Sequence, residues 1–182
     1  MSEDKTMPFF QNEFTSSKRI IHTPSVFAKS ALLYLQEAGE LSAMRPHISA
    51  RSQLPSYLFF TVTAGKGRLD YLGHEYELTT GDSVFIDCRV GYAQSTSEHR
   101  NSDGEFDELW SLSWIHFDGG MMEAIYGKYK ERGGKPVFQC ADFIRYQELI
   151  EKILEIAASD SYVCDMQIAE KITQLLTYLM ED

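Results

Sequence analysis

Five histidines and three cysteines are the residues in this 182-residue chain that are best suited to metal binding or nucleophilic catalysis. The histidines are scattered, and none forms the His-x-His pair that helps to gather three or four ligands around a divalent transition metal. The cysteines form no CxxC pair, and no Gly-x-Ser-x-Gly or Cys-His signature is present. We therefore expect no metal, no cofactor and no catalytic residue. The residues are His22, His47, His74, His99, His116, Cys88, Cys140 and Cys164.

Two tryptophans are better candidates for binding chemistry. If residues 108–117 form a strand, Trp110, Leu112, Trp114 and His116 lie on one face because side chains repeat every two residues. An indole offers a flat apolar wall against which the C–H face of a sugar can stack. The alternative for both tryptophans is that they only fill the core.

The elements before these tryptophans are predicted to be short strands. Residues 57–63 form an unbroken aromatic and β-branched run that ends at glycines 65 and 67. Residues 68–72 and 75–78 flank a Gly73-His74 turn, and Gly81-Asp82 leads into residues 83–86. Such close spacing predicts a barrel or sandwich, in which Trp114 would point inward.

Helical periodicity begins after Gly119-Gly120. We predict a short helix over residues 121–130, a second helix with Asp142 as its N-cap, and a third from about Tyr162 to the end. The last helix has a wide apolar stripe that must pack on the barrel. We expect the stripe also to contact the same helix of a partner subunit, although a purely core role is the alternative. The predicted dimerisation residues are Ile168, Ile172, Leu175 and Leu179.

Composition limits the remaining classes. Residues 1 to about 20 show neither helical nor strand periodicity and are predicted to be a flexible arm. The net charge of −10 argues against nucleic-acid binding by this chain itself. No apolar run approaches the roughly 20 residues that span a bilayer, and the N-terminal sequence lacks a signal-peptide pattern. We therefore expect a cytoplasmic protein without membrane contact.

From about residue 20 to the end, an ordered series of motifs resembles one family. The series includes Thr23-Pro24-Ser25, Gly65-x-Gly67, Tyr76-x-Leu78, Gly81-Asp82, Phe85-Ile86-Asp87-Cys88 and Trp110-x-x-x-Trp114-Ile115-His116-Phe117-x-Gly119. It resembles the N-terminal effector-binding domain of AraC-type bacterial transcription regulators. The resemblance implies a mainly β fold with C-terminal α-helices: a cupin-like (jelly-roll) barrel over residues 21–118, then a helical dimerisation segment over 119–182.

The resemblance also implies a function. Such domains bind a small molecule, often a sugar, form homodimers, and relay binding to a C-terminal helix-turn-helix domain that contacts DNA. No basic recognition-helix pattern occurs in this chain, so DNA contacts are expected only through a domain outside it. The alternatives are a stand-alone metal-dependent cupin enzyme, a dimerisation module without a ligand, or a natural single-domain protein of the same ancestry.

Site residues follow from the resemblance position by position. In sugar-sensing members the effector is held by an arginine from an early strand, polar residues after the Gly-Asp strand, and a tryptophan. These positions correspond to Arg51, to Tyr92 and Gln94 in place of the family's usual His and Tyr, and to Trp114. Two weaker candidates are His47, four residues before Arg51, and Trp110. His116 is expected to be structural.

Overall fold

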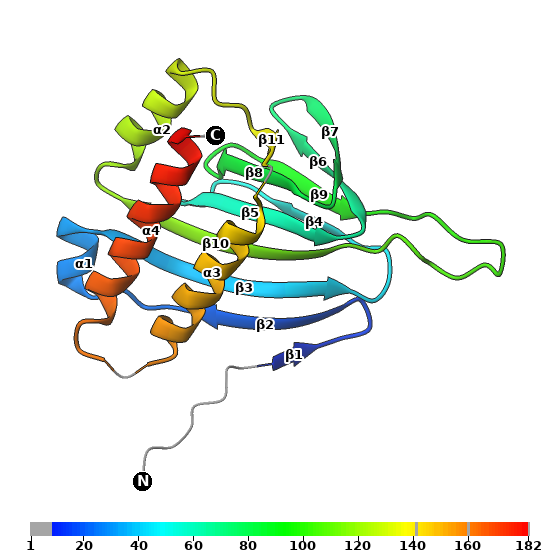
Figure 1. Cartoon of the computed structure of the whole chain (residues 1–182), viewed down its shortest axis with the longest axis horizontal. Helices are drawn as coiled ribbons and strands as arrows, with labels where there is room; N and C mark the ends of the chain where they lie inside the picture. Colours follow the sequence, from blue (N-terminus) through cyan, green and yellow to red (C-terminus); the bar gives the residue numbers. More distant parts are fainter. Residues whose placement is uncertain (1–8, 141, 160, 182) are drawn as a thin grey trace, which may run out of the picture.

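The computed structural model describes residues 9–140, 142–159 and 161–181, which form two antiparallel β-sheets and a layer of helices (Figure 1). The larger sheet has the order β1 (Phe9–Gln11), β2 (Thr15–Ile21), β3 (Leu33–Ala43), β10 (Ser111–Gly119), β5 (Tyr57–Ala64), β8 (Asp82–Asp87) and β11 (Val137–Gln139). The smaller sheet has the order β4 (Ile48–Arg51), β9 (Tyr92–Thr96), β6 (Lys66–Tyr71) and β7 (His74–Thr79).

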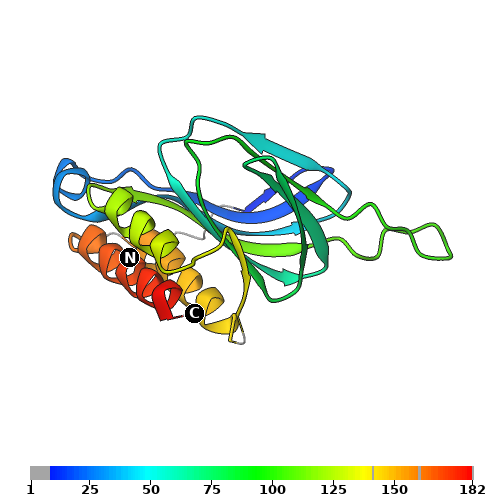
Figure 2. The same ribbon diagram turned by 90° about the horizontal axis from the view of Figure 1, so that it is seen from above.

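Helices cover one face of the larger sheet, and the smaller sheet lies on its other side (Figure 2). They are α2 (Met122–Glu131), α3 (Ile144–Ala157) and α4 (Cys164–Glu181). A short helix, α1 (Val26–Ala31), joins β2 to β3 and starts where the Ser25 hydroxyl accepts a hydrogen bond from the Ala28 amide. Within the described ranges, no helix is both long and apolar enough to cross a membrane.

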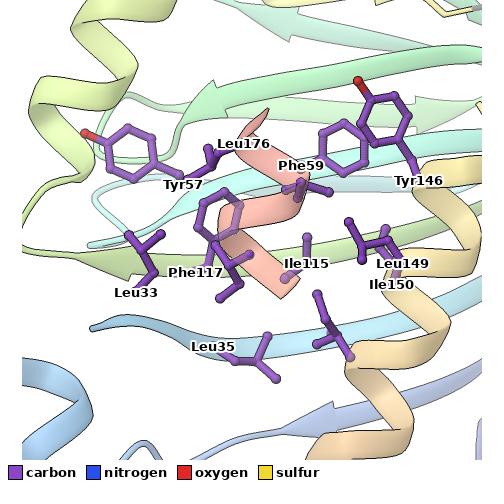
Figure 3. Close-up of a cluster of buried hydrophobic side chains, with 14 of the residues drawn as sticks. Leu33, Leu35, Tyr57, Phe59, Ile115, Phe117, Tyr146, Leu149, Ile150 and Leu176 are labelled. Atoms are coloured by element: carbon purple, nitrogen blue, oxygen red, sulfur yellow. The ribbon is translucent and has the colours of Figure 1, made fainter. Parts of the chain in front are cut away.

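Alternation along β10 divides the interior into two clusters, as its sequence predicts. Ile115 and Phe117 are fully buried on the outer face, where they pack beneath the helices with Leu35 and Phe59 (Figure 3). Leu112 is buried on the inner face, in a cluster formed between the two sheets. The larger sheet is therefore a shared wall between a helix-covered core and a barrel interior.

The apolar stripe of α4 is buried in the cluster between the helices and the larger sheet. Ile168, Ile172, Leu175 and Leu179 are between 0% and 3% exposed in a single chain and belong to the cluster beneath the helices. Their side chains therefore belong to the core of this chain, and a contact of the same residues with a second copy stays a prediction. An apolar stripe predicts burial but does not say whether the covering surface belongs to the same chain.

Three expectations are corrected. Residues 9–20 are not an irregular arm: β1 pairs with β2, and β2 pairs with β3 from Thr15 to Ile21, while residues 1–8 lie outside the described residues. β2 is a polar strand held between β1 and β3 by main-chain hydrogen bonds, so hydrophobic periodicity does not mark it. Asp142 is not the N-cap of α3, because Phe143 occupies that position. The segment after residue 119 also contains β11, which pairs with β8.

Candidate ligand-binding site

The inner face of the larger sheet carries Trp114 and His116 on β10. Across β3, Trp114 is paired with Gly39 and His116 with Glu37, and Gly39 is paired in turn with Arg19 on β2. Residues directly opposite in an antiparallel pair project to the same side of the sheet. One wall of the barrel interior therefore presents an indole, an imidazole, a carboxylate and a guanidinium on neighbouring strands.

Trp114 lies against the backbone of Gly39. A Cβ atom added at Gly39 would sit 2.6 Å from Trp114 Cζ2 and 2.5 Å from the Lys18 carbonyl oxygen, both closer than atoms tolerate. The indole also packs against the inner cluster but remains partly exposed. The glycine thus allows Trp114 to lie flat on the sheet, where part of its ring surface is free to contact a ligand.

The smaller sheet brings three of the predicted residues together. Arg51 on β4 is paired with Tyr92 on β9, and Ser49 with Gln94 two residues further along. On the other side of β9, Gln94 is paired with Leu69, which is completely buried in the inner cluster. Arg51, Tyr92 and Gln94 therefore project from the inner face of the smaller sheet, toward the wall that carries Trp114.

Two polar atoms in this interior are buried without a hydrogen-bond partner among the described residues: the Gln94 Oε1 oxygen and the Trp110 Nε1 nitrogen. Buried polar groups are nearly always hydrogen-bonded, since an unpaired one costs about 1–3 kcal/mol. One is an acceptor and the other a donor. A bound molecule with hydroxyl groups is able to satisfy either of them.

The charged groups of the larger sheet are already paired. Arg19 Nε lies 2.7 Å from Glu37 Oε1, and Arg19 Nη2 donates to Glu37 Oε2 at 3.1 Å. This two-pronged contact is the strongest geometry available to a guanidinium and a carboxylate. Arg19, Glu37, Trp114 and His116 are all partly exposed, and Arg51 is exposed. We call the place where these five residues meet the open end of the barrel.

His116 contributes a neutral ring to the open end. Its Nδ1 lies 3.0 Å from the buried Ser56 hydroxyl. Burial lowers the pKa of His116 to about 4; Glu37 opposes this shift, whereas Arg51 and Arg19 reinforce it. At neutral pH the ring therefore carries no charge and offers hydrogen-bonding atoms only. The ring acts on Arg51 and Glu37 by displacing water and by occupying space, not as a charge.

The thiol beside this cluster is not a nucleophile. Burial raises the pKa of Cys88 to about 12, so that it stays protonated at neutral pH, and burial likewise raises the pKa of Tyr92. In the part of the chain that the structure describes, no three His, Cys, Asp or Glu side chains converge to hold a metal ion. The chemistry of this interior is that of hydrogen bonding and stacking.

Of the two weaker candidates, Trp110 is buried in the inner cluster and His47 lies away from Arg51. Trp110 is 1% exposed just before β10, packed on Gly67 so closely that a Cβ there would collide with its ring. His47 contacts the Arg45 carbonyl at 3.2 Å, and its own carbonyl pairs with the Thr96 amide at the far end of β9 from Arg51. Four residues along a strand span about 13 Å, so His47 and Arg51 are not neighbours.

Glu37 and Arg19 are absent from the predicted site: Arg19 lies in the segment predicted to be an arm, and a β-bulge explains the case of Glu37. Phe117 is paired with Leu35 but His116 with Glu37, so β3 has one extra residue at Gln36. Strict alternation would put Glu37 on the outer face with Leu35. The bulge moves Glu37 to the inner face. It could have been predicted only from knowledge of which strand pairs with residues 33–43.

Comparison with known proteins identifies the family. The family model for the AraC-like ligand binding domain matches residues 34–176, a range that runs from β3 to most of α4 and leaves out β1 and β2. The chain belongs to the AraC-like ligand binding domain family. The predicted fold class, a mainly β cupin-like barrel followed by helices, is confirmed.

Similar solved structures lie at low sequence identity. This AraC-like domain is similar to the AraC-like transcriptional activator CuxR at 10% identity and a TM-score of 0.50, with 90% of this chain and 56% of that chain covered. It is also similar to KdgF from Halomonas sp. (13% identity, TM-score 0.42, 60% and 86% covered) and to ectoine synthase from P. lautus (8%, 0.44, 75% and 83%). The last two likenesses are too weak to bear on function. No curated protein matches the sequence.

Proposed function

We propose that this domain is the sensing part of a transcription regulator: it binds a small hydroxylated molecule, a sugar or sugar derivative, between Trp114 and Gln94. The observation that carries this is the buried, unpaired Gln94 Oε1 on one sheet and the partly exposed Trp114 ring on the opposing sheet. Sugars present hydroxyl donors on their edges and apolar C–H groups on their faces, so they fit both features.

The same strands that line the interior also touch the helices, which supports a relay. On β10, Trp114 faces the interior and Ile115 faces the outer core. β2 carries Arg19 and continues to His22, whose Nε2 lies 3.0 Å from Asp165 Oδ1 in the first turn of α4. A ligand that shifts β2 or β10 therefore acts on helix packing, with coupling of typically about 1–3 kcal/mol.

The readout that we propose is a change in dimer geometry that a DNA-binding domain outside this chain converts into altered DNA contact. Homodimers would form through the exposed side of α4, where Gln167, Glu170, Thr173 and Thr177 lie, because the apolar side is buried. The domain would act in the cytoplasm, as regulators of transcription do, and would not be an enzyme.

Thermal unfolding with a panel of neutral sugars and sugar acids, with and without a chelator, tests this function. A ligand at 100 times its Kd adds about 2.7 kcal/mol of stability, which raises the unfolding midpoint by several degrees in a domain of this size. We expect a ligand-specific rise that the chelator leaves unchanged and that Trp114→Ala abolishes. A chelator-induced loss of stability would favour a metal-dependent enzyme. A flat response across the panel would favour a dimerisation module without a sugar ligand.

A further inference from the structure

The charges at the open end of the barrel do not cancel. Arg19 and Glu37 neutralise each other, since both carboxylate oxygens of Glu37 contact the Arg19 guanidinium at 2.7 and 3.1 Å. His116 is uncharged at neutral pH, because burial holds its pKa far below 7. Arg51 therefore remains as a single positive charge on the rim of an interior that is otherwise neutral.

Arg51 has no acidic partner within the described residues. Its one hydrogen bond there is long, 3.4 Å from Nη1 to the carbonyl oxygen of its neighbour Ala50. Other inward or rim arginines behave differently: Arg19 is paired with Glu37, and Arg89 contacts Asp87 and Asp118. An exposed arginine on a convex surface needs no partner, but Arg51 projects with Tyr92 toward a site that already carries an unpaired Gln94 oxygen.

We propose that the ligand carries one carboxylate, which Arg51 binds, so that the effector is a sugar acid rather than a neutral sugar. This rests on the proposed function and narrows it. A guanidinium presents a planar fork of donors that matches a carboxylate in two parallel hydrogen bonds. One uncompensated positive charge matches one negative charge, whereas a dianion such as a phosphate ester would bring a second charge without a partner.

The charge of the whole chain makes this preference diagnostic. With a net charge of −10, the general field of the protein repels anions. An acid that binds more tightly than its neutral counterpart must therefore be recognised by a local group. Arg51 is the only unpaired cation that the described structure places at the open end.

Isothermal titration with matched probes tests the assignment. The probes are D-glucose and D-glucuronate, D-galactose and D-galacturonate, and D-glucose 6-phosphate, each titrated into wild type, Arg51→Gln and Arg45→Gln. Arg45 is the matched control because it is exposed, loses the same charge, and its guanidinium forms a long ion pair with Glu13 at 3.9 Å. Both substitutions are at exposed positions, so both variants should keep the wild-type unfolding temperature.

We expect at least one acid to bind wild type ten or more times more tightly than its neutral counterpart. Arg51→Gln should remove that advantage, so that the acid and its neutral counterpart bind with similar affinity, and Arg45→Gln should keep it. Added salt should reduce the advantage in wild type.

Equal affinity for acid and neutral sugar would overturn this inference but leave the proposed function standing. A preference that survives in Arg51→Gln, or tighter binding of glucose 6-phosphate than of glucuronate, would also overturn it. Binding of none of the probes would instead count against the proposed carbohydrate function itself.

Discussion

The outer face of the larger sheet is closed by α2, α3 and α4, whereas its inner face is left partly open toward the smaller sheet. On the outer side, Tyr146 packs on Phe59 with ring centroids 4.8 Å apart, and the surrounding side chains are apolar and buried (Figure 3). On the inner side, polar atoms face one another, and Gln94 Oε1 is buried without a partner. The same strands thus support two kinds of packing: one filled by the chain itself, and one that we propose a ligand completes.

Under the proposed function, this difference lets a single sheet bind a ligand on one face and pass the change to the helices on the other face. A fully packed face gives the domain most of its stability. Because its side chains are close-packed, a shift of one strand is passed on to the helices. A face with unpaired polar groups is less stable in isolation and gains most when a ligand arrives. Substitutions on the two faces should therefore separate stability from binding.

The largest effect is expected on the closed face. Leu175→Ala removes a completely buried side chain of α4 and should lower the free energy of unfolding by about 2–5 kcal/mol. Glu151→Ala, on the exposed side of α3, is the control and should change it by less than about 0.5 kcal/mol. Urea denaturation measures both. A Leu175→Ala protein of wild-type stability would contradict the core role of this residue.

A second pair of substitutions probes the open face. Gly39→Ala forces a Cβ into the Trp114 ring and the Lys18 carbonyl, so it should destabilise the fold by about 1–3 kcal/mol and also weaken ligand binding. Gly127→Ala, inside α2 with nothing within 4 Å of the added Cβ, should instead stabilise by about 0.5–1 kcal/mol. Thermal unfolding with and without ligand distinguishes them. Unchanged binding in Gly39→Ala would mean that Trp114 does not form the pocket wall.

Acid should act through His116. Its pKa in the folded chain is about 4, below the ordinary 6.5, so the unfolded state takes up the proton first as the pH falls. Stability is therefore retained above pH 6.5 and lost between pH 6.5 and 4, by up to about 2 kcal/mol at pH 5. His116→Gln should remove this part of the pH dependence. Identical wild-type and His116→Gln stability curves would contradict the buried, neutral ring.

The smallest effect is expected at the link between the two regions. Asp165→Asn weakens the contacts of α4 with His22 and with the Ser25 amide, at 3.0 and 3.2 Å, and should cost about 1 kcal/mol. If β2 relays binding to α4, hydrogen exchange of the first turn of α4 should respond to ligand in wild type but not in this variant. A response of equal size in both would place the relay elsewhere.

The sequence predicts most of the strands and helices because their hydrophobic periods are strong. Residues 57–63 and the alternation of Trp114 and Ile115 are clear examples, and the structure has both. The polar β2 escapes this reasoning because main-chain pairing with β1 and β3, rather than an apolar face, holds it in the sheet. The resemblance selects Arg51, Tyr92, Gln94 and Trp114, which the register places on the inner faces of the two sheets, and their role in effector binding stays a prediction.

The rest of the site depends on register and on long-range pairing. The bulge at Gln36 moves Glu37 to the inner face, and no local pattern marks it. The sequence predicts a structural role for His116. The structure places it beside Glu37 because β10 and β3 are adjacent strands. In the same way, the sequence of α4 predicts an apolar stripe but not which surface buries it. Local sequence constrains each element, but the neighbours that each side chain meets are set by topology.

Acrylamide quenching of tryptophan emission tests the open face most directly, because the chain has only two tryptophans. In Trp110→Phe the remaining Trp114 should be quenched, and D-glucuronate or D-galacturonate, whichever raises the unfolding temperature, should protect it. In Trp114→Phe the buried Trp110 should resist quenching with or without that ligand. Equal protection of both tryptophans in the free protein, or quenching of Trp114 that a stabilising ligand leaves unchanged, would contradict a ligand site on this face.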